Sequence, residues 1–386
     1  MEDGRGRTRT KRSGACRFRH VLWLAVLLGS LLAACRGEEP LRTAVYLVEP
    51  GQLVALDPVD GRELLRVAVP LGWACDIAVS PDGRWVAVVQ GTLVLVPTQG
   101  SGGARILDPP DGWHVLDCLQ SSASAEIPWA LARWADDVSL LVLVRRSSAG
   151  REVRALTAFD TSEGSWRPWT QELVVGCWLL EDPTPEFQLS CERFPDPTWP
   201  PTVAGLLGID PVNGIIQRRV PLIPPEPLRR LGVPFGSPVV GIVEVEERAV
   251  ALAESGLLLL FGAREDEASG IVLWQAAGLT ERASGKALQV APDRRVVWAV
   301  LWRNDGRPAL VLVDLLSRSV ARVVELDGEV SDLDLLPDGT AVLVRETPRG
   351  RELVRRDLRT GRERSVAVLP VNATCCWVGP LAGTAD

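Results

Sequence analysis

Histidine is almost absent from this chain: its 386 residues include two, His20 and His114. A Ser-His-Asp triad outside the N-terminal segment would have to use His114, and no Gly-x-Ser-x-Gly nucleophile elbow occurs in the sequence. A zinc site built from several histidines is excluded by the same count. We therefore predict no metal and no cofactor, and we interpret His114 either as a hydrogen-bonded loop residue or as part of a channel mouth.

Lysine is equally scarce, with Lys11 and Lys286 alone, and the whole chain carries a formal net charge of −7. Residues 1–34, assigned below to a targeting segment, hold seven of the 42 basic and two of the 49 acidic residues, so the remainder carries −12. Binding to phosphate backbones needs a basic surface. We therefore expect no nucleic-acid partner.

The apolar run after the basic N-terminus is too short to span a bilayer comfortably. Residues 21–34 number 14, whereas a spanning helix needs about 20. The run ends in Leu32-Ala33-Ala34-Cys35, which resembles the lipobox of bacterial lipoproteins. The resemblance implies a signal peptide over 1–34, lipidation of Cys35, a tether over 35–41, and a cell-envelope protein anchored on the extracytoplasmic side of a bacterial membrane. An ordinary secretory signal, or a short anchor helix with a chance cysteine, is the alternative.

Short turns between β-type runs recur through the rest of the chain. In residues 76–89, DIAVSPDGRWVAVV, Pro81 presets φ near −65° and Gly83 accepts the positive φ that closes a hairpin. A second type of turn recurs 40 to 63 residues apart, at 57–61, 97–100, 160–164, 210–214, 262–270, 314–319 and 357–361. A four-strand unit with this period is typical of β-propellers. We predict an all-β fold, a single propeller of seven four-stranded blades over 42–380 with a tail over 381–386; a solenoid or two β-sandwiches is the alternative.

The first blade lacks an inner strand in sequence order. After residue 42 come three strand-like runs, TAVYLVE, QLVALD and RELLRVAVP, with none before them. Residues 373–379, ATCCWVG, look like the inner-strand stretch GWACDI at 72–77. We expect the C-terminal strand to complete the first blade and to pair its open edge.

Three of the repeats resemble known propeller families. AVSPDGRWVAVV, LLPDGTAVLV and QVAPDRRVVWAV are similar to WD-repeat-like and TolB-like bacterial propellers, as a repeat pattern over the whole mature chain. The Gly-His and Trp-Asp dipeptides of true WD repeats do not recur, and the separate N-terminal domain of TolB-type proteins is missing. The resemblance therefore implies the fold and neither family's partner.

Six cysteines lie outside the N-terminal segment and its lipobox, and an even number in an exported chain indicates disulfides. Cys177 and Cys191 fall opposite each other in a hairpin whose turn is near 182–185, so we predict a bridge between them. For Cys75, a bridge to Cys375 or Cys376 would fasten the closing strand; buried thiols are the alternative. A thiolate metal site that includes Cys118 is disfavoured because no CxxC spacing occurs.

Acidic residues recur at the turns, where we interpret them as caps of their own turns rather than calcium ligands. Asp332 and Asp334 form a short DxD on an expected inner strand. Asp76 and Asp332 are expected to face the channel.

The expected loops differ between the two faces of the propeller. One set of turns is short and formulaic; the connections on the opposite face are long and rich in Trp and Pro. Rigidly positioned loops are where binding usually occurs, and Trp suits a protein, peptide or carbohydrate ligand. The alternative is that each tryptophan wedges between blades. The binding-face candidates are Trp73, Trp113, His114, Trp166, Trp169, Trp199, Arg229, Arg230, Trp302 and Arg303.

These observations favour a non-catalytic, membrane-anchored binding or scaffold lipoprotein, expected to be monomeric. Its partner would be a protein, peptide or carbohydrate bound on the Trp/Pro-rich face. A propeller enzyme of the quinoprotein or lactonase kind, acting at the channel mouth through acidic ligands, is the first alternative. A purely structural envelope component is the second.

Overall fold

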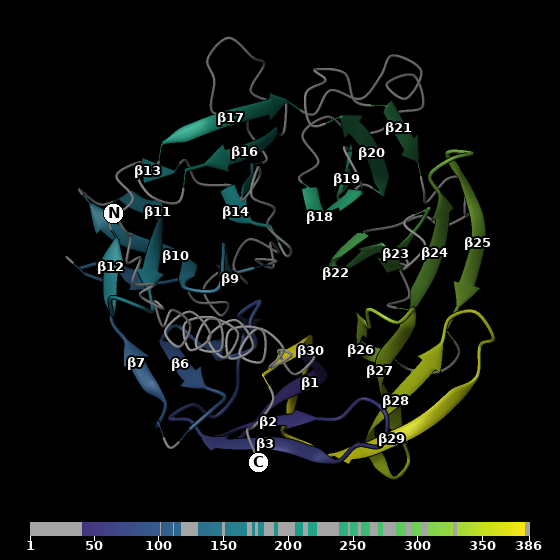
Figure 1. Cartoon of the computed structure of the whole chain (residues 1–386), viewed down its shortest axis with the longest axis horizontal. Coiled ribbons are helices and arrows are strands. Elements are labelled where there is room, and N and C mark those ends of the chain that lie inside the picture. The colour runs from purple at the N-terminus through teal and green to yellow at the C-terminus, as the bar shows by residue number, and fades with distance from the viewer. Residues whose placement is uncertain are drawn as a thin grey trace, which may run out of the picture. The chain divides into compact units, whose positions relative to one another are not determined.

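A computed structural model shows antiparallel sheets arranged in a ring from Leu41 onward (Figure 1). It describes residues 41–382 except 101, 111, 117–129, 149–150, 168–171, 174–176, 181–188, 192–204, 211–214, 222–238, 246–247, 254–255, 263–268, 273–282, 291–294, 303–306 and 327–329. Over these residues the regular structure is all β, and no helix among them is long and apolar enough to cross a membrane.

Seven sheets form the ring, each with its first strand innermost and its last on the rim. Blade 1 is β30 (Thr374–Leu381), β1 (Arg42–Glu49), β2 (Gln52–Leu56) and β3 (Glu63–Ala68). Blade 2 is β4 (Asp76–Val79), β5 (Trp85–Val89), β6 (Leu93–Pro97) and β7 (Arg105–Leu107). Blade 3 is β8 (His114–Val115), β9 (Ala132–Trp134), β10 (Ser139–Ser148), β11 (Arg151–Asp160), β12 (Ser165–Arg167) and β13 (Glu172–Leu173). Blade 4 is β14 (Cys177–Leu179), β15 (Leu189–Cys191), β16 (Gly205–Ile209) and β17 (Ile216–Pro221). Blade 5 is β18 (Val239–Val245), β19 (Arg248–Ala253), β20 (Leu257–Gly262) and β21 (Ser269–Val272). Blade 6 is β22 (Ala283–Val290), β23 (Val296–Trp302), β24 (Pro308–Asp314) and β25 (Ser319–Glu325). Blade 7 is β26 (Val330–Leu335), β27 (Thr340–Thr347), β28 (Gly350–Asp357) and β29 (Glu363–Leu369).

The predicted seven-bladed propeller is confirmed, and blade 3 fits it with two divided strands. There β8 and β9 share the inner position along β10, and β12 and β13 share the outer position along β11. The sheet therefore has six assigned strands but four strand positions.

The C-terminal strand closes the ring, as predicted. β30 pairs antiparallel with β1, with Arg42 opposite Leu381 and Val48 opposite Thr374. The chain's single tyrosine, Tyr46, is fully buried and donates its hydroxyl to the Pro380 carbonyl at 2.7 Å. The strand reaches one residue past the predicted boundary at 380, because Leu381 still pairs in the sheet.

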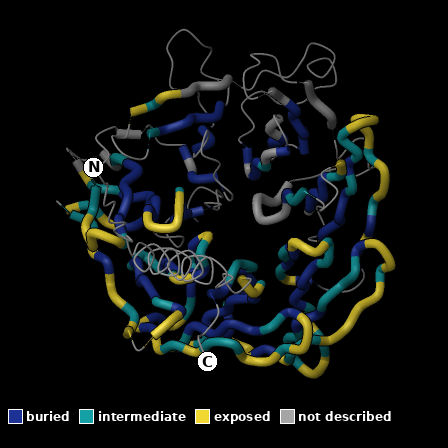
Figure 2. Tube along the Cα trace, viewed as in Figure 1, coloured by how far each residue is buried: buried dark blue, intermediate teal, exposed yellow. Residues whose placement is uncertain are grey.

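The core lies between the blades rather than within any one of them. Separate clusters of buried apolar side chains join blades 2 to 4, 5 to 6, 6 to 7, 7 to 1 and 1 to 2. Figure 2 shows the buried strands toward the centre and the exposed segments along the rim. A sheet buried on both faces needs continuous apolar strands, and β5 and β6 supply them, whereas the rim strands β3 and β25 are mostly exposed or half-buried.

Alternation of strand direction gives the ring two distinct faces. The short-turn face carries the hairpins that follow each blade's first and third strands, such as residues 80–84, 336–339, 57–61 and 357–361. The long-connection face carries the links between blades and the middle hairpins. Residue 83 needs glycine: φ is +67°, and a Cβ would lie 2.6 Å from the backbone N of Ala382. The short-turn face is thus where the closing strand ends.

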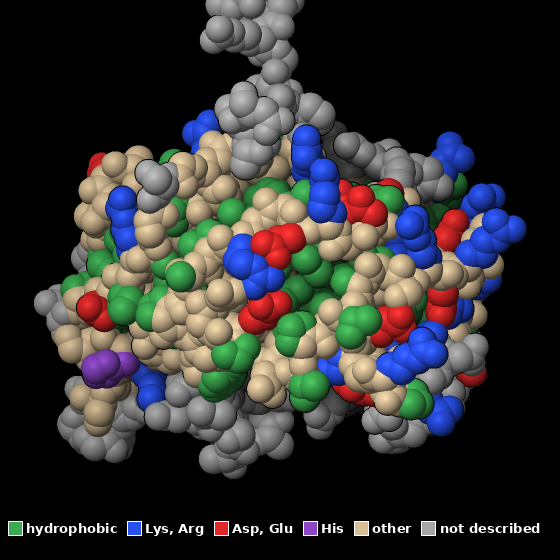
Figure 3. Space-filling view, turned by 90° about the horizontal axis from the view of Figure 1, so that it is seen from below, with side chains coloured by type: hydrophobic (Ala, Val, Ile, Leu, Met, Phe, Trp, Pro, Cys, Tyr) green, Lys and Arg blue, Asp and Glu red, His purple; other side chains and the backbone are tan. Residues whose placement is uncertain are grey.

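The rim between these faces carries charge of both signs. Figure 3 views it from the side of β3 and β29 and shows acidic and basic side chains interspersed with apolar ones. Arg66 pairs with Glu49 and Glu63, and Glu363 pairs with Arg345 and Arg356. This part of the rim therefore presents no surface of a single sign.

Aspartates cap the short turns, as predicted. Asp57, Asp82, Asp338 and Asp357 each accept a backbone N–H two residues further on, at 2.7–3.0 Å. These bonds satisfy donors that a tight turn would otherwise leave unpaired.

We expect these caps to make stability fall in acid. The N–H of Thr360 lowers the pKa of Asp357, that of Leu316 lowers the pKa of Asp314, and a serine hydroxyl lowers that of Asp160. A lowered folded-state pKa gives stability that is fully present above the unfolded value of about 3.9 and is lost as pH falls through the folded value. Urea midpoints should therefore drop between about pH 6 and about pH 3. Asp357→Asn keeps an acceptor oxygen but does not titrate, so its midpoint should drop less; equal drops would refute this cap's contribution.

Candidate functional site

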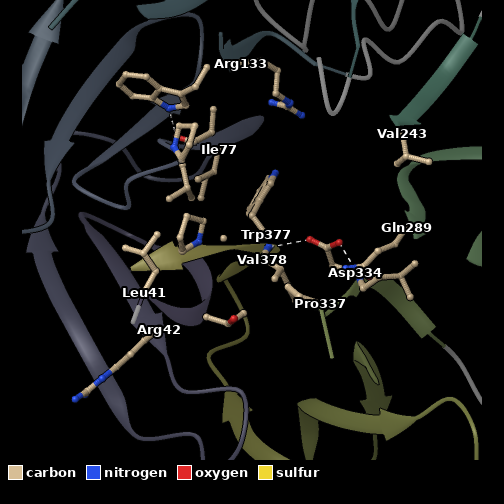
Figure 4. Close-up of a pocket in the computed structure, with 18 of the residues that line it drawn as sticks. Leu41, Arg42, Ile77, Arg133, Val243, Gln289, Asp334, Pro337, Trp377 and Val378 are labelled. Carbon is tan, nitrogen blue, oxygen red and sulfur yellow. Dashed lines mark hydrogen bonds between the residues drawn. The ribbon is translucent and has the colours of Figure 1, made fainter. Parts of the chain in front are cut away.

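A cavity of about 600 Å³ lies in the central channel toward the short-turn face (Figure 4). Pro81 and Pro337 line it from two short turns, and Leu41 lines it from the start of the described chain. Figure 4 shows Trp377 pointing into it from β30 and the Arg133 guanidinium pointing into it from β9. The volume suits a small ligand.

Asp76, the acid predicted to face the channel from blade 2, forms a buried ion pair. Asp76 on β4 binds Nη1 of Arg133 on β9 at 2.8 Å, and the side chains are 5% and 9% exposed. The same carboxylate accepts the N–H groups of Leu131 at 2.8 Å and Ala132 at 3.2 Å. Asp76 therefore joins the inner strands of two neighbouring blades.

Blades 7 and 1 are joined by the same device. Asp334 on β26 accepts the N–H of Val378 on β30 at 2.8 Å, and Asp332 accepts that of Cys376. An inner strand has no sheet neighbour on its channel side, so the N–H groups on that side need acceptors from elsewhere. The DxD motif supplies them.

These bonds give the two acids that motivated the enzyme alternative a role between blades. Asp76 and Asp332 were to act as channel ligands for a metal or quinone, whereas both hold backbone N–H groups of the next blade. Among the residues that the structure describes, no group of three or more His, Cys, Asp or Glu is placed to hold a metal ion.

Trp113 and His114 lie where the connection from β7 enters β8, on the long-connection face. Trp113 ends the connection from β7, packs against the core of blades 2 to 4, and carries the Arg146 guanidinium carbon 4.4 Å from its ring centroid. His114 begins β8, opposite Arg145 on β10, and is exposed. A cation–π contact of this kind contributes about 0.5–2 kcal/mol and holds the indole and the guanidinium in one arrangement.

Trp73 lies on the same face in the connection from β3 to β4. It is half-buried, and the side-chain amide of Gln90 meets both its carbonyl and its indole N–H once the amide is oriented to suit them. Gln90 follows β5 in the middle hairpin of blade 2. Gln90 of blade 2 thus holds Trp73 in place, as Arg146 of blade 3 holds Trp113.

The assignment of Trp166 to the long-connection face is wrong. It is the second residue of β12, which starts directly after the turn at 160–164, and this puts it at the short-turn end of blade 3. It packs edge-on against Phe159, with ring centroids 5.3 Å apart, and lines a cavity of about 290 Å³ with Trp85 of blade 2. Trp166 is therefore a wedge between blades, the alternative raised for each tryptophan.

The other candidates are placed only in part. Trp302 ends β23, opposite Pro308. Trp169, Trp199, Arg229, Arg230 and Arg303, with Cys35 and Cys118, lie outside the described residues.

One cysteine prediction is confirmed and one is wrong. Cys177 and Cys191 are directly opposite in β14 and β15 and form a disulfide. Cys375 and Cys376 are joined to each other, and Cys75 is bonded to neither of them although it is itself in a disulfide. The bridge predicted to fasten the closing strand to Cys75 therefore does not form.

Sequence reasoning missed Arg133 and Arg146. Arg133 lies between Ala132 and Trp134 in β9, and Arg146 lies just after the apolar run LLVLV of β10. A basic residue within or beside an apolar run must find a partner where it is buried, and that was the available signal.

No protein-family model matches the chain, and no curated protein matches it. Solved structures do. A functionally unknown protein from Desulfotomaculum acetoxidans is 10% identical, with a TM-score of 0.54 over 88% of this chain and 98% of that one. The apo structure of AztD from Citrobacter koseri is 14% identical, with a TM-score of 0.49 over 89% of this chain and 99% of that one. The first of these likenesses shows the fold alone.

Proposed function

We propose that this protein is a membrane-anchored extracytoplasmic lipoprotein that binds a partner through its long-connection face. The partner is a protein, peptide or carbohydrate. The anchor is Cys35, supported by the lipobox resemblance of residues 32–35.

The observation that carries the proposal is the group formed by Trp113, His114 and Arg146. Trp113 is held between the core and a guanidinium, and His114 beside it is exposed. Binding sites favour aromatic and arginine side chains whose conformation is set before the partner arrives. At the short-turn face, Trp166 packs between blades instead of standing beside an exposed residue of this kind, and the capping aspartates bond within their own turns.

Photo-crosslinking from inside the face tests the proposal. A photoreactive residue at His114 should give a discrete adduct in envelope preparations, and the same residue at Leu316 should not. Leu316 is 75% exposed and lies in a short turn, so it is a matched control. The adduct should fall several-fold in Trp113→Ala and in Arg146→Ala, provided that both keep the wild-type unfolding midpoint.

Other results would contradict the proposal. Equal adducts from His114 and Leu316 would favour the purely structural alternative, in which neighbours touch the propeller on any side. An adduct that persists in both variants would remove Trp113 and Arg146 from the binding face.

A further inference from the structure

We infer that the short-turn face is held against the membrane and the long-connection face is turned away from it. The inference rests on the proposed anchor at Cys35. Given that anchor, the orientation follows from geometry: the place where the chain enters the propeller decides which face a bilayer around the lipid can reach.

The entry point lies at the short-turn end of the channel. Arg42 pairs with Leu381, the last residue of β30, and the next residue, Ala382, donates its N–H to Gly83 in a short turn at 3.2 Å. Leu41 lines the channel cavity together with Pro81 and Pro337. The first described residue is therefore on the short-turn face, beside the channel mouth.

The tether is shorter than the propeller is thick. Six residue steps separate Cys35 from Leu41, and six steps span at most about 20 Å. The eight residues of β1 run from the short-turn face to the long-connection face, and their seven steps rise about 24 Å.

Reaching the opposite face would need a still longer path. The tether would first have to cross β2 and β3 to the rim, about 10 Å at two strand spacings, and then climb the whole rim. The sum of about 34 Å exceeds the reach of about 20 Å. A lipid on Cys35 cannot bring the long-connection face to the bilayer.

An edge-on arrangement is also within reach of the tether. It would place the rim of blades 7 and 1 against the bilayer, where residues 345–364 hold eight arginines against four acids and four of the arginines are paired; the side view shows charges of both signs there (Figure 3). Attraction of such basic residues requires anionic lipid. On neutral lipid that attraction is absent, and the short-turn face, where the chain enters, is left as the membrane-proximal surface, with the channel cavity opening toward the bilayer.

Energy transfer from two matched positions tests the orientation. A fluorescent amino acid replaces Leu316 on the short-turn face or Val371 on the long-connection face; these side chains are 75% and 78% exposed. The acylated full-length product is reconstituted into phosphatidylcholine vesicles that carry an acceptor dye on a headgroup. Donor quenching should be several-fold stronger at Leu316 than at Val371, because transfer falls steeply over the thickness of the propeller.

Each contrary outcome has its own meaning. Equal quenching, or stronger quenching at Val371, in a protein whose intact mass shows acylated Cys35 overturns the orientation and leaves the anchor standing. A native product without acyl mass, still soluble as Cys35→Ser would be, overturns the anchor and the orientation with it.

Discussion

Replacing Asp76 with alanine is expected to lower the free energy of unfolding by about 3–5 kcal/mol, the cost of leaving one partner of a buried ion pair alone. The Arg133 guanidinium, whose side chain is 9% exposed, would lose its 2.8 Å partner. The N–H groups of Leu131 and Ala132 would lose their acceptor at the same time. Urea unfolding followed by the fluorescence of the 14 tryptophans measures the change.

Asp60→Ala is the matched control. Asp60 also accepts a backbone N–H, that of Arg62 at 3.0 Å, but at an exposed turn. A single exposed bond of this kind contributes about 1 kcal/mol or less. If Asp76→Ala costs no more than Asp60→Ala, the carboxylate does not join blades 2 and 3. If Asp76→Glu restores the free energy of unfolding, the carboxylate and its bonds are what stabilise the protein at this position.

Removing the closing strand is expected to abolish cooperative folding. A chain that ends at Pro370 leaves blade 1 with three strands and exposes the inner edge of β1. It also loses the side chains of Trp377 and Leu381 from the core between blades 1 and 2. Burying each large apolar side chain contributes about 1.5–3 kcal/mol, against a total stability of about 5–15 kcal/mol. The unpaired edge is in addition a template for aggregation.

A chain that ends at Ala382 is the control, since it keeps all of β30. It should unfold cooperatively like the full chain, and the shorter chain should elute as aggregate or show no cooperative transition. A peptide of residues 371–382 added in trans should restore the transition by pairing with β1, as strand addition does elsewhere. A cooperative shorter chain without the peptide would show that closure by β30 is dispensable.

The fold was predictable from signals within a few residues, namely turns and facing strand residues. The wrong predictions concern contacts and positions that such signals do not define. The turns at 57–61, 160–164 and 357–361 can be recognised from Asp, Gly and their spacing, because turn geometry is set within a few residues. Cys177 and Cys191 are facing residues of one hairpin, so their bridge was predictable. A bridge from Cys75 to the closing strand was expected and does not form, because pairing between different blades depends on distances that local spacing does not give. Trp166 was misplaced although the turn before it was recognised, since the strand after that turn must start at the short-turn face.

The sequence by itself determined that this protein is a closed ring of seven blades, because a four-strand unit that cannot bury both faces of its sheet must stack on copies of itself. It also determined that the last strand completes the first blade. Only the tertiary structure decided what the acids do: Asp76 and Asp332 were expected as channel ligands, whereas they and Asp334 accept N–H groups of the neighbouring inner strands. It also decided which tryptophans lie on the long-connection face, because Trp113 precedes an inner strand there whereas Trp166 follows a short turn on the opposite face.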